Sequence, residues 1–172
     1  MGLKLLAIPI TLVVCAGCGE KQSPGAPGTV GGTSADPVVY FSGSDSKMNT
    51  AMSKARQTVD RFIKALSAPQ PNQSGFSVKK EFPTNGGSGE HIWLVDVKYA
   101  DGKFTGTVAN DPEKVANLKF GDKASVTRGE ISDWMFMEDK DTFVGAYTLR
   151  VMLDNPNAGP EEAALRKMKF KD

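Results

Sequence analysis

The chain has 172 residues, of which 40% are hydrophobic and 24% charged, and its 21 basic and 20 acidic residues leave a formal net charge of +1. This composition is that of a globular protein and excludes a chain that is disordered throughout. The charges are balanced and form no long run of either sign, which argues against nucleic-acid binding. The only cysteines are Cys15 and Cys18, so the sequence beyond them can form neither a disulfide nor a thiolate metal site.

The N-terminal segment has the order of features found in an export signal. Lys4 precedes an apolar run at 5–14 that is too short to span a bilayer, and small residues follow it. The stretch from Cys15 to Cys18 resembles the lipobox of bacterial lipoproteins, in which a small residue precedes the cysteine that receives lipid. Because Gly17 precedes Cys18, we expect lipidation at Cys18 and removal of Cys15 with the signal. A plain secretory signal is the alternative.

A Gly-, Pro- and Ser-rich segment follows Cys18 up to residue 36. It contains one large aliphatic residue, Val30, and cannot bury enough apolar surface to order itself, so we expect a flexible tether. Acyl chains on Cys18 would contribute about 0.8 kcal/mol of membrane binding per buried methylene. By resemblance to enterobacterial sorting, where Asp after the lipidated cysteine retains a protein at the inner membrane, Gly19 and Glu20 favour the outer membrane. The domain is expected to face the periplasm.

The first elements of the folded part have clear periodic patterns. Apolar residues over 48–66 recur at i, i+3, i+4 and i+7, which predicts an amphipathic helix that packs on a sheet, with Asp45 or Ser46 at its start. Strands are predicted at 76–82 and 92–99. In the second of them, alternation places Trp93, Val95, Val97 and Tyr99 on one face.

The middle of the sequence continues with strands and turns. Asp101-Gly102 predicts a type I′ hairpin that leads into a strand at 103–109. Asn110, Asp111 and Pro112 then predict a short helical turn through Val115. Further strands are predicted over 123–127 and 131–137, followed by a solvated turn at 138–141.

Two segments near the C-terminus remain to be assigned. The apolar residues of 143–153 fit a strand and a helix equally well. Residues 160–168 predict a terminal helix, because Pro160 and two glutamates stand at its start and Arg166 and Lys167 near its end.

These elements predict an α+β fold: one long amphipathic helix packed on a mostly antiparallel sheet, with a short C-terminal helix. The expected organisation is a signal peptide (1–17), a lipidated cysteine with a flexible tether (18–36) and a single domain (37–172).

Several stretches of the sequence together resemble the domain of unknown function 2314 family, a small bacterial module. The resemblance covers 48–153 and rests on MNTAMSKARQTVDRF, GEHIWLVDV, FTGTVANDP, FGD, ISDWMF and GAYTLRVML. Its most specific pieces are Trp93 after Glu90-His91, Asn110 and Pro112 after Gly106, Asp133-Trp134, and Gly145 before Tyr147-Thr148. The resemblance implies a fold but no reaction and no catalytic residues.

The sequence offers little for catalysis or for cofactors. His91 is the only histidine, and it would need Glu90 or Asp133 and a nucleophile beside it in a cleft to act in a hydrolase. No G-x-S-x-G motif accompanies it. Residues 138–141 lack the glycine and terminal glutamate of a calcium loop, and no nucleotide-binding fingerprint is present. We therefore expect no enzyme activity, no metal and no cofactor.

The candidate binding residues are Glu90, His91, Trp93, Asp133 and Trp134. Both tryptophans stand beside polar residues, and each fits either the core or a binding face, with the core favoured. Asp133 could satisfy an indole or a backbone donor.

The arrangement of a lipobox, a tether and one domain without catalytic residues resembles that of immunity lipoproteins. The expected function is therefore that of a periplasmic lipoprotein that binds a protein, such as a toxin secreted by competing bacteria, and neutralises it. The alternative is an envelope or cell-wall accessory lipoprotein that binds peptidoglycan or a small ligand, which would need a concave aromatic pocket around Trp93 or Trp134.

Overall fold

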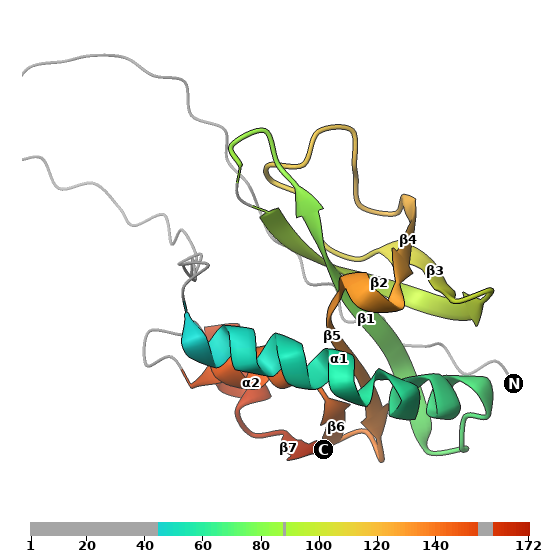
Figure 1. Ribbon diagram of the computed structural model, residues 1–172. Helices are drawn as coiled ribbons and strands as arrows, with labels where there is room; N and C mark the ends of the chain where they lie inside the picture. Colours follow the sequence, from blue (N-terminus) through green and yellow to red (C-terminus); the bar gives the residue numbers. More distant parts are fainter. Residues whose placement is uncertain (1–44, 88, 155–159) are drawn as a thin grey trace, which may run out of the picture. The chain divides into compact units, whose positions relative to one another are not determined.

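The structure is a computed structural model that describes residues 45–87, 89–154 and 160–172 (Figure 1). The described residues all fall in the same compact unit of the chain. The predicted signal peptide, Cys15, Cys18, the tether and the domain boundary at residue 37 lie outside them. None of the helices in these ranges is long and apolar enough to cross a membrane.

The described part of the chain forms one mixed α+β arrangement built on a seven-stranded sheet of order β4-β3-β2-β1-β5-β6-β7. Its elements are α1 (Ser46–Ser67), β1 (Gln73–Pro83), β2 (Gly89–Ala100), β3 (Lys103–Val108), β4 (Lys123–Thr127), η1 (Arg128–Glu130), β5 (Ile131–Glu138), β6 (Thr142–Gly145), α2 (Tyr147–Leu153), α3 (Pro160–Leu165) and β7 (Lys169–Lys171). Every strand pair is antiparallel except β6 with β7, so the predicted mostly antiparallel sheet is confirmed.

Helix α1 begins where the sequence places a capping residue. The Asp45 side chain accepts hydrogen bonds from the backbone N–H groups of Lys47 and Met48 at 2.9 and 3.1 Å. The helix packs on β5 and buries Ala51, Ala55, Val59 and Phe62. Full burial of an aromatic side chain such as Phe62 contributes roughly 1.5–3 kcal/mol, so this contact orders the helix against the sheet.

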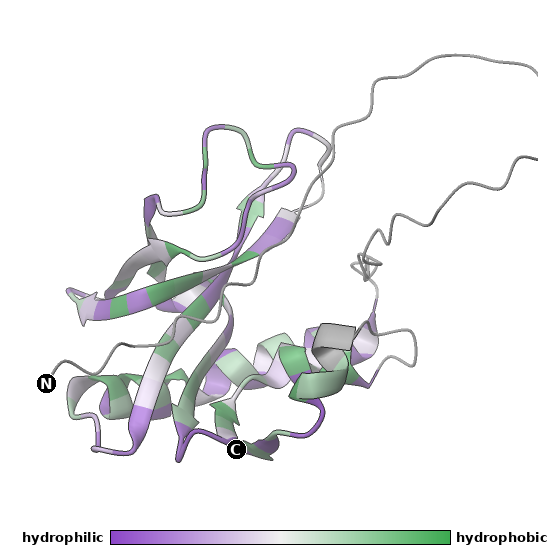
Figure 2. Ribbon diagram, turned by 180° about the vertical axis from the view of Figure 1, so that it is seen from behind, coloured by the Kyte–Doolittle hydropathy of each residue, from purple (hydrophilic) through white to green (hydrophobic). Residues whose placement is uncertain are grey.

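The structure corrects the prediction that Trp93, Val95, Val97 and Tyr99 share one face of strand β2. Ile92 and Leu94 are fully buried, whereas Trp93 and Val95 are partly buried on the opposite side. A bulge then shifts the pairing with β3, and Asp96 within it has a φ of 52°. The extra residue reverses the alternation, so Val97 and Tyr99 join the core while Trp93 and Val95 do not. Simple period-two counting cannot reveal such a bulge. Figure 2 shows the alternation as hydrophobic and hydrophilic bands along the strands.

The sheet is strongly curled, because η1 joins two strands that are four positions apart in the sheet order. In a flat sheet β4 and β5 would be about 19 Å apart, but the chain from Thr127 to Ile131 extends at most about 14 Å. The side chain of Lys80 on β1 contacts both β4 and η1. Its Nζ donates to the Ser125 carbonyl at 3.5 Å and to the Glu130 carboxylate at 2.7 Å.

The curl gives the sheet an inner and an outer face. The inner face carries the core residues Val78, Ile92, Leu94, Phe104, Val126 and Trp134. The outer face carries the alternate positions, among them Lys79, His91, Trp93 and Val95. Figure 1 shows that β3 and β4 lie away from α1, which packs mainly on β5.

The remaining predictions divide between correct and wrong. The Asp101-Gly102 hairpin and the turn after Glu138 are confirmed. Residues 143–153 contain both alternatives, since β6 ends at Gly145 and α2 follows. The helical turn predicted from Asn110 to Val115 is wrong, because the Asn110 side chain instead accepts the Trp93 N–H at 2.8 Å.

The C-terminal prediction is also corrected. The helix expected over 160–168 ends at Leu165, and the chain then forms strand β7, which pairs in parallel with β6. A three-residue strand carries too little periodicity to be predicted, because its existence depends on the open edge of a distant strand.

Candidate functional site

The polar side chains of the outer face gather around Lys79 in the middle of β1. In the strand register, Lys79 lies between Trp93 of β2 and Asp133 of β5. His91 lies two pairs further along β2, opposite Glu81, and Thr148 approaches from α2. We call Lys79, His91, Trp93, Ser132, Asp133 and Thr148 the Lys79 cluster.

Asp133 of β5 is fully buried, and its side chain caps the N-terminus of α2. Its Oδ1 accepts from the N–H groups of Trp134 at 2.9 Å and Tyr147 at 3.1 Å. Its Oδ2 accepts from the N–H and the hydroxyl of Thr148 at 2.8 and 2.6 Å. The cap position of α2 is Ala146, which has no side-chain acceptor, so Asp133 satisfies the donors that Ala146 cannot. Burial raises the pKa of Asp133, while the bonds from Thr148 and the charge of Lys79 oppose this.

Lys79 is an almost fully buried cation, with 8% of its surface exposed. Its Nζ lies 3.4 Å from the Thr148 hydroxyl and 5.1 Å from the centre of the Trp93 ring. The Thr148 hydroxyl therefore stands between the ammonium and the Asp133 carboxylate. Burial lowers the pKa of Lys79, and the negative charge of Asp133 works against that effect.

Nothing in the sequence analysis singled out Lys79, although one signal was present. Lys79 and Lys80 are adjacent in a predicted strand, so their side chains must point to opposite faces of the sheet. The lysine that shares the inner face with Val78 is Lys80, however. Lys79 is enclosed on the outer face by its contacts with Trp93 and Thr148. Ser132 was also missed, because a lone serine in a strand carries no signal.

His91 is exposed at one side, and its Nδ1 lies 3.0 Å from the Ser132 hydroxyl. Partial burial of the ring and the charge of Lys79 lower the pKa of His91, and Glu81 acts in the opposite direction. A histidine beside a serine has the composition of a base and a nucleophile. However, Ser132 is only 3% exposed, so its hydroxyl is poorly placed to meet a substrate.

Two of the candidate residues lie outside the Lys79 cluster. The Glu90 carboxylate accepts from the backbone N–H groups of Glu113 and Lys114, both at 2.9 Å, and so holds the loop between β3 and β4. Trp134 lies fully buried on the inner face, and its indole donates to the Ala55 carbonyl of α1 at 2.9 Å. The indole thus finds its partner in α1 and not in Asp133.

The described ranges also contain a surface groove but no metal-binding group of side chains. No group of three or more His, Cys, Asp or Glu residues there is placed to hold a metal ion. A groove lined by Arg150, Leu153, Asp154, Arg166 and Phe170 contains none of the candidate residues.

Comparison with known proteins identifies one family and two relatives. The model of a family described as "Uncharacterized protein conserved in bacteria (DUF2314)" matches residues 45–164. The "Uncharacterized protein YegJ" of Escherichia coli (strain K12) is 33% identical over 126 residues, which cover 73% of this chain and 80% of that protein. The "Putative ankyrin repeat protein NMB1133/NMB1171" of Neisseria meningitidis serogroup B (strain ATCC BAA-335 / MC58) is 31% identical over 68% of this chain and 49% of its own length. No solved structure is significantly similar to the chain.

Proposed function

Because the chain belongs to the DUF2314 family, we propose that it is a membrane-anchored, periplasm-facing lipoprotein whose family domain is non-catalytic and binds a protein. The observation that carries the binding role is the outer face of the sheet. There Trp93 is partly exposed beside Lys79, on the side opposite the core that α1 covers. Tryptophan is among the residues that most often dominate the energy of protein interfaces.

The side chains that could serve catalysis have other tasks. The oxygens of Asp133 accept the N-terminal donors of α2, and those of Glu90 hold a loop. Ser132 is buried beneath His91. These contacts favour binding over hydrolysis, because a catalytic base needs an accessible nucleophile in reach.

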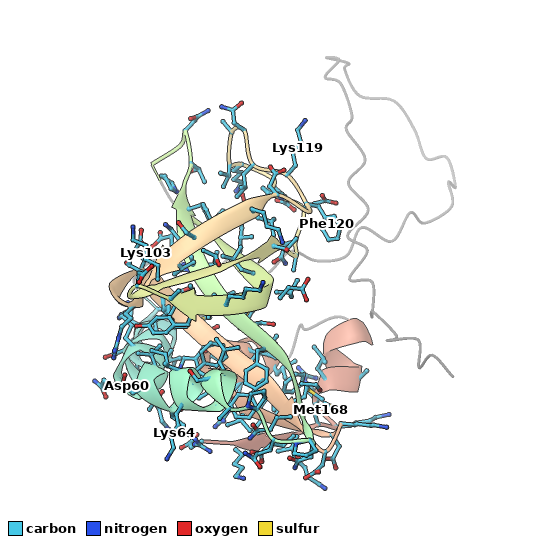
Figure 3. All side chains as sticks on the ribbon, turned by 90° about the vertical axis from the view of Figure 1, so that its right-hand side faces the viewer. Asp60, Lys64, Lys103, Lys119, Phe120 and Met168 are labelled. Carbon is cyan, nitrogen blue, oxygen red and sulfur yellow. The ribbon has the colours of Figure 1, made fainter. Side chains whose placement is uncertain are left out.

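Helix α1 belongs to this proposal as an amphipathic element. Its residues Ala51, Ala55, Val59 and Phe62 are buried, and Lys64 and Asp60 are labelled at its surface in Figure 3. A helix that has already buried its apolar side has little left to offer a partner. The partner is therefore expected at the outer face of the sheet.

Membrane anchoring is proposed through lipid on Cys18, with the outer membrane favoured. The test is fractionation of cells that express the full chain. Cys18→Ala should release the protein from the membrane fraction or stall its maturation, whereas the matched change Cys15→Leu should leave anchoring intact. Equal membrane association of both variants would contradict lipidation at Cys18.

The proposed partner is a toxin delivered by competing bacteria. Sensitive cells that express the full chain should survive a toxin-delivering competitor better than cells with an empty vector. Cells that express Cys18→Ala should lose that protection if the anchored form is the active one. Survival that is the same with and without the chain, across competitors that kill the sensitive cells, would remove the immunity role.

The alternative role is that of a cell-wall accessory protein, and the partial exposure of Trp93 also favours it. Sugar rings stack on exposed aromatic side chains, so soluble peptidoglycan fragments should quench Trp93 fluorescence. Trp93→Phe serves as the control, because it leaves the buried Trp134 as the single emitter. Quenching that persists in this variant would not come from Trp93.

A further inference from the structure

We infer that the outer face of β2, β3 and β4 docks an acidic protein surface, with Trp93 and Val95 as apolar contacts at one side of it. This inference rests on the proposed protein-binding role and adds the chemistry of the partner.

The strand register places three lysines and four hydroxyls side by side on this surface. Across β2, β3 and β4 the paired rows are Val95, Thr107 and Lys123; Lys98, Thr105 and Ser125; and Ala100, Lys103 and Thr127. The three lysines surround Thr105, one on each strand. The strand spacing and the rise per residue place the Cα atom of each lysine roughly 5–9 Å from that of Thr105. We call these nine residues the lysine face.

The three lysines of the lysine face have no ion-pair partner within the described part of the chain. Lys98, Lys103 and Lys123 are all exposed, and none forms an ion pair there. The Lys123 Nζ donates to the neutral Thr107 hydroxyl. The nearest carboxylates along the chain are those of Asp96, Asp101 and Asp122, and none of them forms an ion pair with these lysines. The Asp122 carboxylate instead accepts the Lys119 N–H at 2.9 Å.

Four other lysines of the described residues form ion pairs, whereas the lysine face brings three lysines without one onto adjacent strands. Lys80 binds Glu130 at 2.7 Å, and Lys171 binds Glu138 at 2.8 Å. A positive patch without partners is complementary to an acidic surface, and such complementarity steers association and fixes orientation.

An aromatic and an aliphatic side chain adjoin the lysines at one side of the lysine face. Trp93 and Val95 are partly buried at one side of it, and exposed polar residues surround them. Protein interfaces commonly have an apolar centre with an aromatic anchor and a polar rim that exchanges hydrogen bonds and charges. The hydroxyls of Thr105 and Ser125 can donate to carboxylates that the lysines attract.

Among the described residues, the outer side chains of β3 and β4 are largely exposed, whereas their inner side chains Phe104 and Val126 are buried in the core. The main contacts of the two strands are with neighbouring strands, while α1 packs mostly on β5 and α2. Figure 3 shows Lys103 at one end of this three-stranded segment and the exposed Phe120, with Lys119, at the other end. Because Phe120 is exposed and lies away from Lys103, its substitution tests separately whether the protein binds a lipid surface.

The experiment measures binding of poly-L-glutamate to the full chain and to two variants that lose the same charge. The first, Lys98→Gln/Lys103→Gln/Lys123→Gln, should weaken binding about tenfold, as expected for the loss of three exposed ion pairs. The control, Lys47→Gln/Lys64→Gln/Lys140→Gln, changes exposed lysines on other elements and should weaken it less than about threefold by residual charge effects. All these side chains are exposed, and matching thermal unfolding would confirm that the variants fold.

Three results would overturn the inference. The first is the absence of poly-L-glutamate binding by the unaltered chain, and the second is equal weakening in both variants. The third is binding to phosphatidylglycerol vesicles that is lost in Phe120→Ser, together with no binding of poly-L-glutamate.

Protection from a toxin separates this inference from the proposed function. If the Lys98, Lys103 and Lys123 variant protects cells as well as the unaltered chain does, the proposed docking role of the lysine face is wrong and the immunity role stands. If no protection is seen but poly-L-glutamate binding depends on the lysine face, the immunity role fails and the lysine face is supported.

Discussion

Asp133 shows how much a single buried side chain organises in this fold. It accepts four hydrogen bonds, from Trp134, Tyr147 and Thr148, and it lies in register beside the buried Lys79. The residue therefore orders the start of α2 and compensates the Lys79 charge. Both tasks need a carboxylate, because each of its oxygens must accept.

Replacement of Asp133 should reveal these tasks as a loss of stability. Asp133→Asn would turn an amide N–H₂ toward backbone donors and leave the Lys79 charge uncompensated, so it should destabilise the fold by about 3–5 kcal/mol in urea unfolding. Asp111→Asn, at an exposed loop position, should stay within about 0.5 kcal/mol. Similar small effects of both changes would contradict the role of Asp133.

His91 predicts a pH dependence of stability. Its pKa is lowered from the ordinary 6.5, so the unfolded chain binds the proton more readily than the folded protein. The contribution of neutral His91 is complete above pH 6.5 and is lost as the pH falls through the folded-state pKa. Urea unfolding of the unaltered chain should therefore weaken more steeply below pH 6.5 than that of His91→Gln. Parallel curves for the two proteins would contradict this prediction, since the carboxylates they share contribute equally to both.

At the scale of elements, the junction between β6 and α2 depends on Gly145. Its φ is 79°, and a Cβ there would lie 2.5 Å from the Trp134 carbonyl oxygen. Gly102 in the β2–β3 turn has a similar φ of 74°, but a Cβ there would meet nothing within 4 Å. Alanine at Gly102 would therefore introduce backbone strain alone, whereas alanine at Gly145 would add a steric clash.

Alanine at these two positions should give different losses. Gly102→Ala should cost about 1–2 kcal/mol from the left-handed conformation alone. Gly145→Ala must also displace the β5 backbone or the Trp134 ring, and it should cost more than about 3 kcal/mol or prevent soluble expression. Thermal unfolding measures both, and equal shifts would show that the β6 junction can move aside.

The link η1 between β4 and β5 gives a second prediction at this scale. Glu130 accepts a hydrogen bond from Lys80 and further ones from Thr127, and these bonds lower the pKa of Glu130 to about 2. Because its side chain is 44% exposed, Glu130→Gln should cost only about 0.5–1 kcal/mol at pH 7. The cost should be complete above pH 4.5 and shrink as the pH falls toward 2, where the carboxylate becomes protonated. A cost in urea unfolding that stays constant over this range would contradict the prediction.

At the scale of the whole molecule, the C-terminal strand lies outside the family match, which ends at residue 164. Asp172 binds Lys54 of α1 at 2.6 Å and Arg150 of α2 at 2.7 Å, and Phe170 stacks on Phe143. Strand β7 therefore connects elements that the family core already holds together.

Deletion of residues 169–172 should lower stability without unfolding the domain. We expect a loss of about 2–3 kcal/mol from the removed Phe170 contact and strand pairing. Asp172→Asn alone should cost less than about 1 kcal/mol, because its ion pairs are exposed. Thermal unfolding tests both proteins, and loss of the folded state on deletion would show that the core requires β7.

The sequence alone determined the elements whose signals are local. Helix α1, its Asp45 cap, the Asp101-Gly102 hairpin and strand β4 follow from periodicity, capping and turn chemistry, which act within a few residues. The family was also predictable, because its landmarks are short contiguous stretches.

Only the tertiary structure decided where the outer-face residues lie and what they contact. The bulge at Asp96 moved Trp93 out of the core, and pairing across β1 brought Lys79 beside Asp133. Asp133 caps a helix 14 residues away in sequence, and β7 pairs with a strand that precedes it by more than 20 residues. These outcomes depend on which distant groups meet to satisfy buried donors and charges, and a local pattern contains no record of those partners.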